Sequence, residues 1–175
     1  MNSYHFNVPD EKVEEWYNKA KKFKFGLQDH IDIYQFGLLL NNGIVYEYNF
    51  GIFYLTDLNN PPGNAYVHAL MWDRRTKGRE WYAKELIKKN MDYFELHRLT
   101  ACIPAVNRIT TKWLMRIGFT AEGYIRAYMV FNNQLYDMLV LGYYSDTLKN
   151  YISLNYKETN NKDDDSYSSR QHSTK

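Results

Sequence analysis

The chain has 175 residues, a length typical of a single domain. Hydrophobic residues make up 45% of it, enough for a packed core. The formal net charge of +2 gives no whole-molecule attraction for nucleic acid or an anionic membrane. The longest apolar run, FGLLL, falls far short of the ~20 residues that span a bilayer, and the N-terminus lacks signal-peptide features. We therefore expect a cytoplasmic protein that binds neither membrane nor nucleic acid.

The only cysteine, Cys102, excludes an internal disulfide and a cysteine-rich metal site. It lies in the apolar run LTACI, where a small buried hydrophobic residue is expected. No metal site is predicted.

The first half reads as one helix followed by strands. Pro9 and the acidic residues after it favour a helix over 8–23, with Gly26 as the stop signal. Residues 31–50 contain two apolar runs around Asn41-Asn42-Gly43, which predicts a hairpin because Asn-Gly supplies positive φ values. Further strands are expected over 51–58 and 64–72.

The second half alternates strands and helices. A basic loop leads into a helix over 81–96, a strand over 98–103 and a helix over 108–118. Two β-rich runs broken at Asn132-Asn133 follow, over 120–144. This order predicts an α/β (α+β) layer with helices packed on a sheet. We expect a single domain over 1–156 and a polar, flexible tail over 157–175, whose composition cannot offset its ordering entropy.

Three segments carry further information, and the first is a basic loop at a predicted helix start. Backbone N–H groups at a helix N-terminus bind phosphate, and glycine lets the ligand approach closely. Its residues are Arg75, Thr76, Lys77, Gly78, Arg79 and Glu80.

The second segment is a strand, an asparagine and a short helix that ends in Gly-Phe. Asn107 caps the predicted helix, and Thr110 follows one turn later. The third is a run with Glu-Gly, Arg, a turn, Tyr-Asp and an apolar final strand. Its matching residues are Gly118, Phe119, Glu122, Gly123, Arg126, Tyr136 and Asp137.

In this order, the three segments resemble the GNAT N-acetyltransferase superfamily, and most closely its branch that acetylates ribosomal-protein N-termini. The resemblance covers roughly residues 25–145. It implies a mixed, mostly antiparallel sheet of six or seven strands, flanked by about four helices and splayed between its fourth and fifth strands to admit acetyl-CoA. It also implies an amine-bearing substrate: a protein N-terminus, a lysine or a small molecule.

The resemblance further implies roles for individual residues. The loop 75–80 would bind the cofactor pyrophosphate, although Glu80 replaces a small residue and its carboxylate would repel the phosphates unless it turns outward. Asn107 and Thr110 would lie near the pantetheine arm, and a backbone N–H of Met71 or Trp72 would bind the thioester carbonyl. Leu114 falls where many members carry a tyrosine as general acid.

The general base is open. The fourth-strand position that often carries glutamate falls near Val67, and His68 beside it is our candidate because its ordinary pKa is near neutrality. A half-buried structural histidine is the alternative. Glu47, Asp73 and Glu122 are read as ordinary surface or loop charges.

A second hypothesis arises from the departures at Glu80 and Val67: a catalytically inactive GNAT scaffold, for example a phage virion component inside or on the particle. It would contact other protein subunits through exposed aromatics and the C-terminal tail. A third reading, nucleic-acid binding through Arg74, Arg75, Lys77 and Arg79, is less economical than a phosphate cradle.

Overall fold

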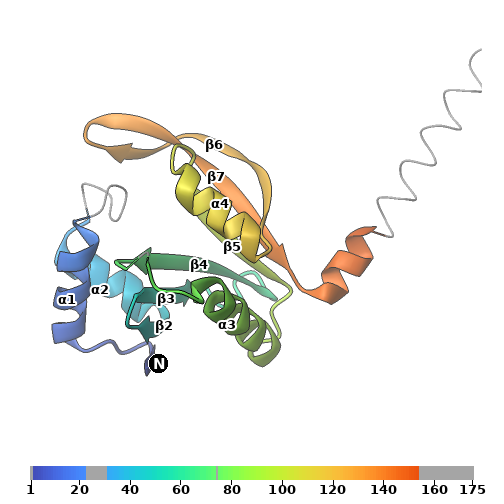
Figure 1. The fold of residues 1–175 in the computed structure, drawn as a ribbon, viewed down its shortest axis with the longest axis horizontal. Helices are drawn as coiled ribbons and strands as arrows, with labels where there is room; N and C mark the ends of the chain where they lie inside the picture. Colours follow the sequence, from blue (N-terminus) through green and yellow to red (C-terminus); the bar gives the residue numbers. More distant parts are fainter. Residues whose placement is uncertain (1, 23–30, 74, 154–175) are drawn as a thin grey trace, which may run out of the picture.

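The computed structural model describes residues 2–22, 31–73 and 75–153. One seven-stranded sheet runs through them in the order β1-β2-β3-β4-β5-β7-β6 (Figure 1). Neighbouring strands pair antiparallel except β4 and β5, which are parallel. The predicted mixed, mostly antiparallel sheet is confirmed. The strands are β1 (Asn2–His5), β2 (Gly43–Tyr48), β3 (Gly51–Thr56), β4 (Asn64–Met71), β5 (Arg98–Pro104), β6 (Thr120–Phe131) and β7 (Gln134–Tyr144).

Helices cover both faces of the sheet and define two cores. They are α1 (Asp10–Ala20), α2 (Ile33–Asn41), α3 (Arg79–Tyr93) and α4 (Arg108–Ile117). One core joins α1 and α2 to β2 and β3 around Trp16, Phe36 and Ile52. The other joins α3 and α4 to the opposite face around Leu86, Leu99 and Leu141. Residues 146–153, after β7, are also helical. The predicted stop signal at Gly26 and the tail over 157–175 lie outside the described residues.

The predicted hairpin around Asn41-Asn42-Gly43 is wrong, because the run before it is helix α2 rather than a strand. Asp32 begins this helix with a capping box, in which its carboxylate accepts from the Gln35 N–H at 2.7 Å and the Gln35 side chain accepts from the Asp32 N–H at 3.0 Å. Phe36 and Leu40, four residues apart, are fully buried on one helical face. Reciprocal capping and this buried stripe favour a helix for the apolar run that we predicted to be a strand.

Two hairpins do form. One joins β2 to β3 across Asn49 and Phe50. The other joins β6 to β7 across Asn132 and Asn133, where the predicted break occurs and both asparagines have positive φ (49° and 55°). The second hairpin extends beyond the body of the molecule (Figure 1).

The sheet opens between β4 and β5, as predicted. Their parallel pairing covers three positions only, Asn64 with Arg98, Ala65 with Leu99 and Tyr66 with Thr100. Beyond Tyr66 the two strands separate, so that β1–β4 and β5–β7–β6 form the two arms of a V (Figure 1).

No helix in the described part of the chain is long and apolar enough to cross a membrane.

Candidate functional site

The loop between β4 and α3 is organised around Asp73. Its carboxylate accepts from the Arg75 N–H at 2.8 Å and from the Thr76 hydroxyl at 2.7 Å. The Thr76 hydroxyl, followed by the Arg75 N–H, holds the pKa of Asp73 below its usual range. The loop is therefore a built turn rather than a loose basic segment, and Asp73 has a structural role in it.

Gly78 begins helix α3 in the left-handed region, with φ 78°. It offers no side chain to cap the helix, and a Cβ placed there would meet nothing closer than the Tyr82 ring at 3.8 Å. The first N–H groups of α3 therefore have no capping side chain, and Gly78 adds no side-chain bulk beside them. Such an end attracts anions through its N–H groups and its dipole.

Glu80, the residue expected to repel phosphate, is engaged elsewhere. Its carboxylate forms an ion pair with Arg116 of α4 at 2.7 Å. The pair ties the start of α3 to the end of α4 and neutralises the Glu80 charge. Arg79 extends towards the end of β4, where its guanidinium nitrogen Nη1 lies 3.9 Å from the sulfur of Met71.

Met71 at the end of β4 and Trp72 after it are the two candidates for binding the thioester carbonyl, and their backbone N–H groups point in different directions. The Trp72 N–H donates to the Phe50 carbonyl at 3.1 Å, so it faces β3. Successive residues of a strand point their N–H groups to opposite sides, and the β3–β4 register has no bulge. The Met71 N–H therefore faces away from β3, towards the opening, and Trp72 is occupied as a donor.

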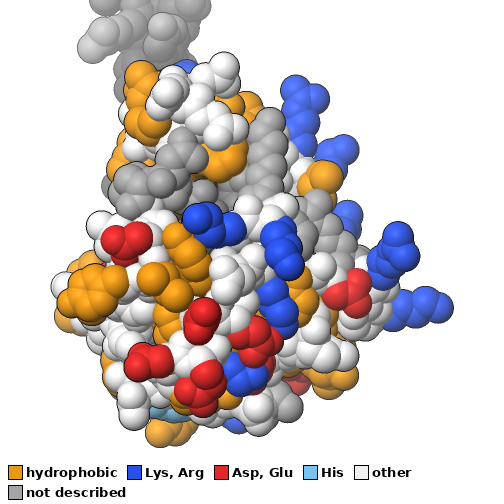
Figure 2. Space-filling model, turned by 90° about the vertical axis from the view of Figure 1, so that its left-hand side faces the viewer, with side chains coloured by type: hydrophobic (Ala, Val, Ile, Leu, Met, Phe, Trp, Pro, Cys, Tyr) orange, Lys and Arg blue, Asp and Glu red, His pale blue; other side chains and the backbone are white. Residues whose placement is uncertain are grey.

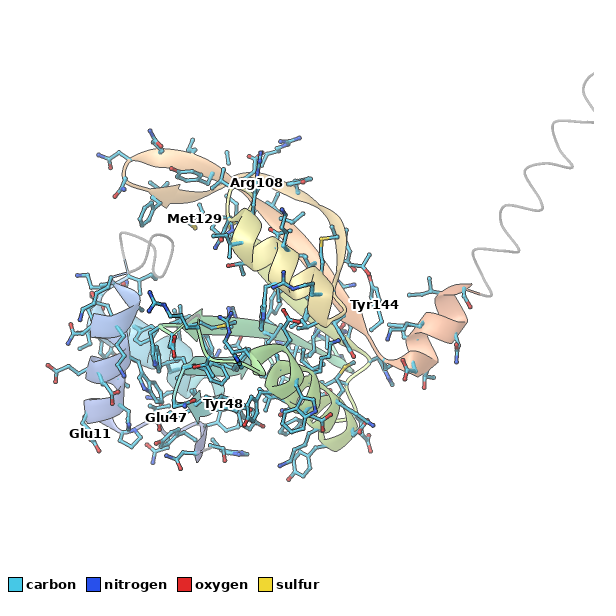
Figure 3. The ribbon with its side chains drawn as sticks, viewed as in Figure 1. Glu11, Glu47, Tyr48, Arg108, Met129 and Tyr144 are labelled. Carbon is cyan, nitrogen blue, oxygen red and sulfur yellow. The ribbon has the colours of Figure 1, made fainter. Side chains whose placement is uncertain are left out.

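A cavity of about 640 Å³ occupies the opening between the two arms. Of the predicted site residues it is lined by His68, Asn107 and Thr110, whereas the loop 75–80 and the pair Met71 and Trp72 do not line it. Its wall on the far arm includes Met129 of β6, which Figure 3 labels opposite the arm that carries α1. The site thus divides into the uncapped start of α3 and a largely apolar cavity.

His68 lies on the face of β4 that packs towards α1 and α2, opposite the face that carries Val67. Its ring stacks on Tyr54, with ring centroids 4.5 Å apart, and its Nε2 lies 3.1 Å from the Thr56 hydroxyl. Burial lowers the pKa of His68 to about 4, against a smaller opposing effect of Asp57. The imidazole is therefore neutral at pH 7 and able to accept a proton.

Asn107 caps α4 through its side-chain oxygen, which accepts from the Thr110 N–H at 3.3 Å. The cap holds both residues at the cavity wall. Leu114 is buried in the same wall and cannot donate a proton. Cys102 is half-buried there, and burial raises the pKa of its thiol, as expected for an inert cysteine.

The remaining acids are paired outside the cavity. Glu47 accepts from Lys12 at 2.7 Å and from Tyr4, and Figure 3 places it beside α1, away from Met129. The Glu122 carboxylate accepts hydrogen bonds from both guanidinium amino groups of Arg98. No cluster of metal-ligating side chains occurs in the described ranges.

Three residues of the site were not singled out from the sequence: Tyr54, Thr56 and Asp57. Tyr54 and Thr56 reach His68 only through the β3–β4 register, which pairs Tyr54 with His68 and Thr56 with Tyr66. The β3–β4 pairing is the signal that identifies Tyr54 and Thr56, because residues on the same face of paired strands are neighbours.

Figure 2 views the end of the molecule formed by α1 and the β6–β7 hairpin, with hydrophobic side chains spread from its top down its left side and most acidic ones in its lower half. On the hairpin, Tyr124, Tyr128, Val130 and Leu135 are exposed.

The comparisons with known proteins agree with this fold. The sequence model described as an acetyltransferase (GNAT) domain matches residues 12–140. None of the curated proteins matches the chain.

Three solved structures have a similar fold. A ribosomal-protein-alanine N-acetyltransferase from Brucella melitensis is 16% identical with a TM-score of 0.63, over 83% of this chain and 100% of that one. A chimera of the Vibrio cholerae spermidine N-acetyltransferase SpeG and hSSAT is 16% identical with a TM-score of 0.62, over 82% and 94%. The microcin C7 self-immunity acetyltransferase MccE, solved with acetyl-CoA and AMP, is 16% identical with a TM-score of 0.58, over 78% and 89%.

Proposed function

Since the chain belongs to the GNAT acetyltransferase family, we propose that it is an active enzyme that acetylates an amine, with His68 as base. GNAT acetyltransferases use acetyl-CoA and act on amine substrates. When bound, acetyl-CoA supplies an acetyl group activated as a thioester. The residues of this chain would hold that cofactor, orient its carbonyl and remove a proton from the amine.

The observation that carries the proposal is the uncapped start of α3 beside the opening of the sheet. The first N–H groups of α3 have no capping side chain, and Gly78 leaves room in front of them. These groups, with Arg75, Lys77 and Arg79, would hold a pyrophosphate. Thr76 supports the loop through Asp73. The residues present therefore fit acetyl-CoA.

The cavity supplies the rest of the donor site. Asn107 and Thr110 line the wall along which a pantetheine arm would lie. The Met71 N–H, directed towards the opening, is available to polarise a carbonyl. The Trp72 N–H already donates to Phe50, so we assign this role to Met71 alone.

His68 would take the proton of the acceptor amine. It lines the cavity on the α1/α2 side of β4, and its low pKa keeps it unprotonated at pH 7. A base with so low a pKa has little driving force for removing a proton. The contribution of His68 to the rate therefore depends on how closely its ring nitrogen is held to the amine.

The alternative of an inactive scaffold is not favoured. Its main support was the carboxylate of Glu80 beside the phosphate site, and that carboxylate is paired with Arg116.

Calorimetric titration of acetyl-CoA into the protein and into Gly78→Asp tests the donor site. An aspartate at this position offers a carboxylate to the free N–H groups of α3 and repels phosphate, and aspartate tolerates positive φ better than most residues. We expect the wild type to bind and the variant to bind about 100-fold more weakly, with a loss of folding stability of about 1–2 kcal/mol from the left-handed backbone. A wild type that gives no binding heat at about millimolar acetyl-CoA would remove the proposal.

A further inference from the structure

The side chains around His68 determine which of its two ring nitrogens carries the proton and which can accept one. This inference rests on the proposed function, in which His68 is the base. Its Nε2 lies 3.1 Å from the Thr56 hydroxyl oxygen, and that oxygen lies 3.4 Å from Oδ2 of Asp57. Thr56 is buried, and its hydroxyl contacts both His68 and Asp57. The three side chains therefore form one chain of contacts.

The hydroxyl of Thr56 has one proton to give. An ionised carboxylate can only accept, so we assign the Thr56 proton to the contact with Asp57. The Thr56 oxygen is then an acceptor for His68, which requires the proton of the neutral imidazole to lie on Nε2. Nδ1 is left with its lone pair, and it has no hydrogen-bond partner within the described part of the chain.

We propose that Thr56, polarised by Asp57, is a positioning residue that holds His68 in the Nε2–H tautomer, so that Nδ1 accepts the proton of the acceptor amine. As the new nitrogen–carbon bond forms and the carbon–sulfur bond of the thioester breaks, the amine gives one proton to Nδ1. His68 then gives that proton to the departing thiolate and ends neutral.

The surroundings of His68 support this assignment. Asp57 is the only carboxylate among the described residues that line the cavity, and no lysine or arginine lines it. Asp57 has a left-handed backbone, with φ 50°, in the turn after β3. Tyr54 stacks on the imidazole from β3 and fixes the plane of the ring. The ring is thus held in orientation by Tyr54 and in tautomer by Thr56.

The first test is nitrogen-15 NMR of the uniformly labelled protein at pH 7, with the His68 signals identified by their loss in His68→Gln. We expect a protonated Nε2 and an unprotonated Nδ1 in the wild type and in Thr56→Ser, which keeps the hydroxyl. In Thr56→Val and Asp57→Asn, we expect a mixture of tautomers. A wild type with the proton on Nδ1, or Thr56→Val with an unchanged tautomer, overturns the proposal.

The second test is steady-state kinetics with acetyl-CoA and three amines: a peptide with a free N-terminal alanine, tyramine and spermidine. For the best of these, we expect kcat to fall about ten-fold or more in Thr56→Val and Asp57→Asn, less in Thr56→Ser, with KM for acetyl-CoA unchanged. Asp146→Asn, which removes an exposed carboxylate after β7, is the matched control and should keep wild-type kcat.

The outcomes distinguish a failure of the proposed function from a failure of the tautomer assignment. A wild type that acetylates none of the three amines counts against the proposed function. In that case the NMR measurement of the His68 tautomer still tests the role of Thr56. A wild type that acetylates while Thr56→Val keeps its kcat overturns the inference alone.

Discussion

At the scale of single residues, desolvation keeps the imidazole of His68 neutral. Its pKa of about 4 lies below the ordinary 6.5, mainly because the ring, which stacks on Tyr54, is desolvated by burial. The same shift that prepares His68 to accept a proton couples the protein's stability to pH.

We predict that His68 makes the protein less stable in mild acid. Below pH 6.5 the unfolded chain binds a proton at His68 that the folded protein does not, so the free energy of unfolding falls as the pH falls, and the effect levels off below about pH 4. The loss from this residue is at most about 3 kcal/mol. Urea unfolding of the wild type and His68→Gln between pH 4 and pH 8 measures it, and equal pH slopes for the two proteins would refute the assignment.

The pair Glu80–Arg116 gives a second prediction at this scale. Arg116→Gln frees the Glu80 charge beside the expected phosphates and should weaken acetyl-CoA binding by roughly ten-fold or less, since the pair is exposed. Glu80→Gln should tighten binding, and the double variant should lie near the wild type. Calorimetry on this four-protein cycle checks it. If the two single variants shift affinity in the same direction, the pair does not act on phosphate through charge.

Some of the site could be predicted from single residues and some could not. The loop 75–80 and Asn107 follow from local signals, a glycine at a helix start and a helix cap, so the sequence is enough to locate them. The choice of Met71 over Trp72 depends on which edge of β4 each N–H faces. The roles of Thr56 and Glu80 depend on contacts with His68 and Arg116 that only the tertiary fold creates.

At the scale of elements, α2 is where local reading fails. The apolar run FGLLL over residues 36–40 is compatible with a buried strand, and the Asn-Gly that follows it is typical of a hairpin turn. The overlooked signal is Asp32 followed three residues later by Gln35, which is a capping box. The strands over 51–58 and 64–72 and the helices of the second half have no such competing signal, and they are confirmed.

The cap makes a direct prediction for α2. Asp32→Ala should lower the free energy of unfolding by about 1 kcal/mol, because the Gln35 N–H loses its acceptor. Asp32→Asn is the matched control, since asparagine caps equally well. Urea denaturation of the three proteins measures the difference, and an alanine variant as stable as the asparagine variant would show that the cap contributes nothing.

At the scale of the whole molecule, the V of the sheet brings the parts together. Loss of β4–β5 pairing after Tyr66 opens the sheet on the side that the Met71 N–H faces, and the loop after β4 leads to the start of α3. His68 reaches the cavity from the other face of β4. One splayed strand therefore connects the proposed anion site, the proposed carbonyl donor and the proposed base.

Together, these parts should transfer an acetyl group to an amine. The most direct test supplies acetyl-CoA carrying carbon-13 in its acetyl group, together with a mixture of amines and peptides with free N-termini, and follows both products by mass spectrometry. We expect at least one labelled N-acetylated amine, formed in equal amount with free CoA, and a clear loss of both products in Gly78→Asp. A protein that binds acetyl-CoA but labels no amine above the rate without protein would contradict the proposed function.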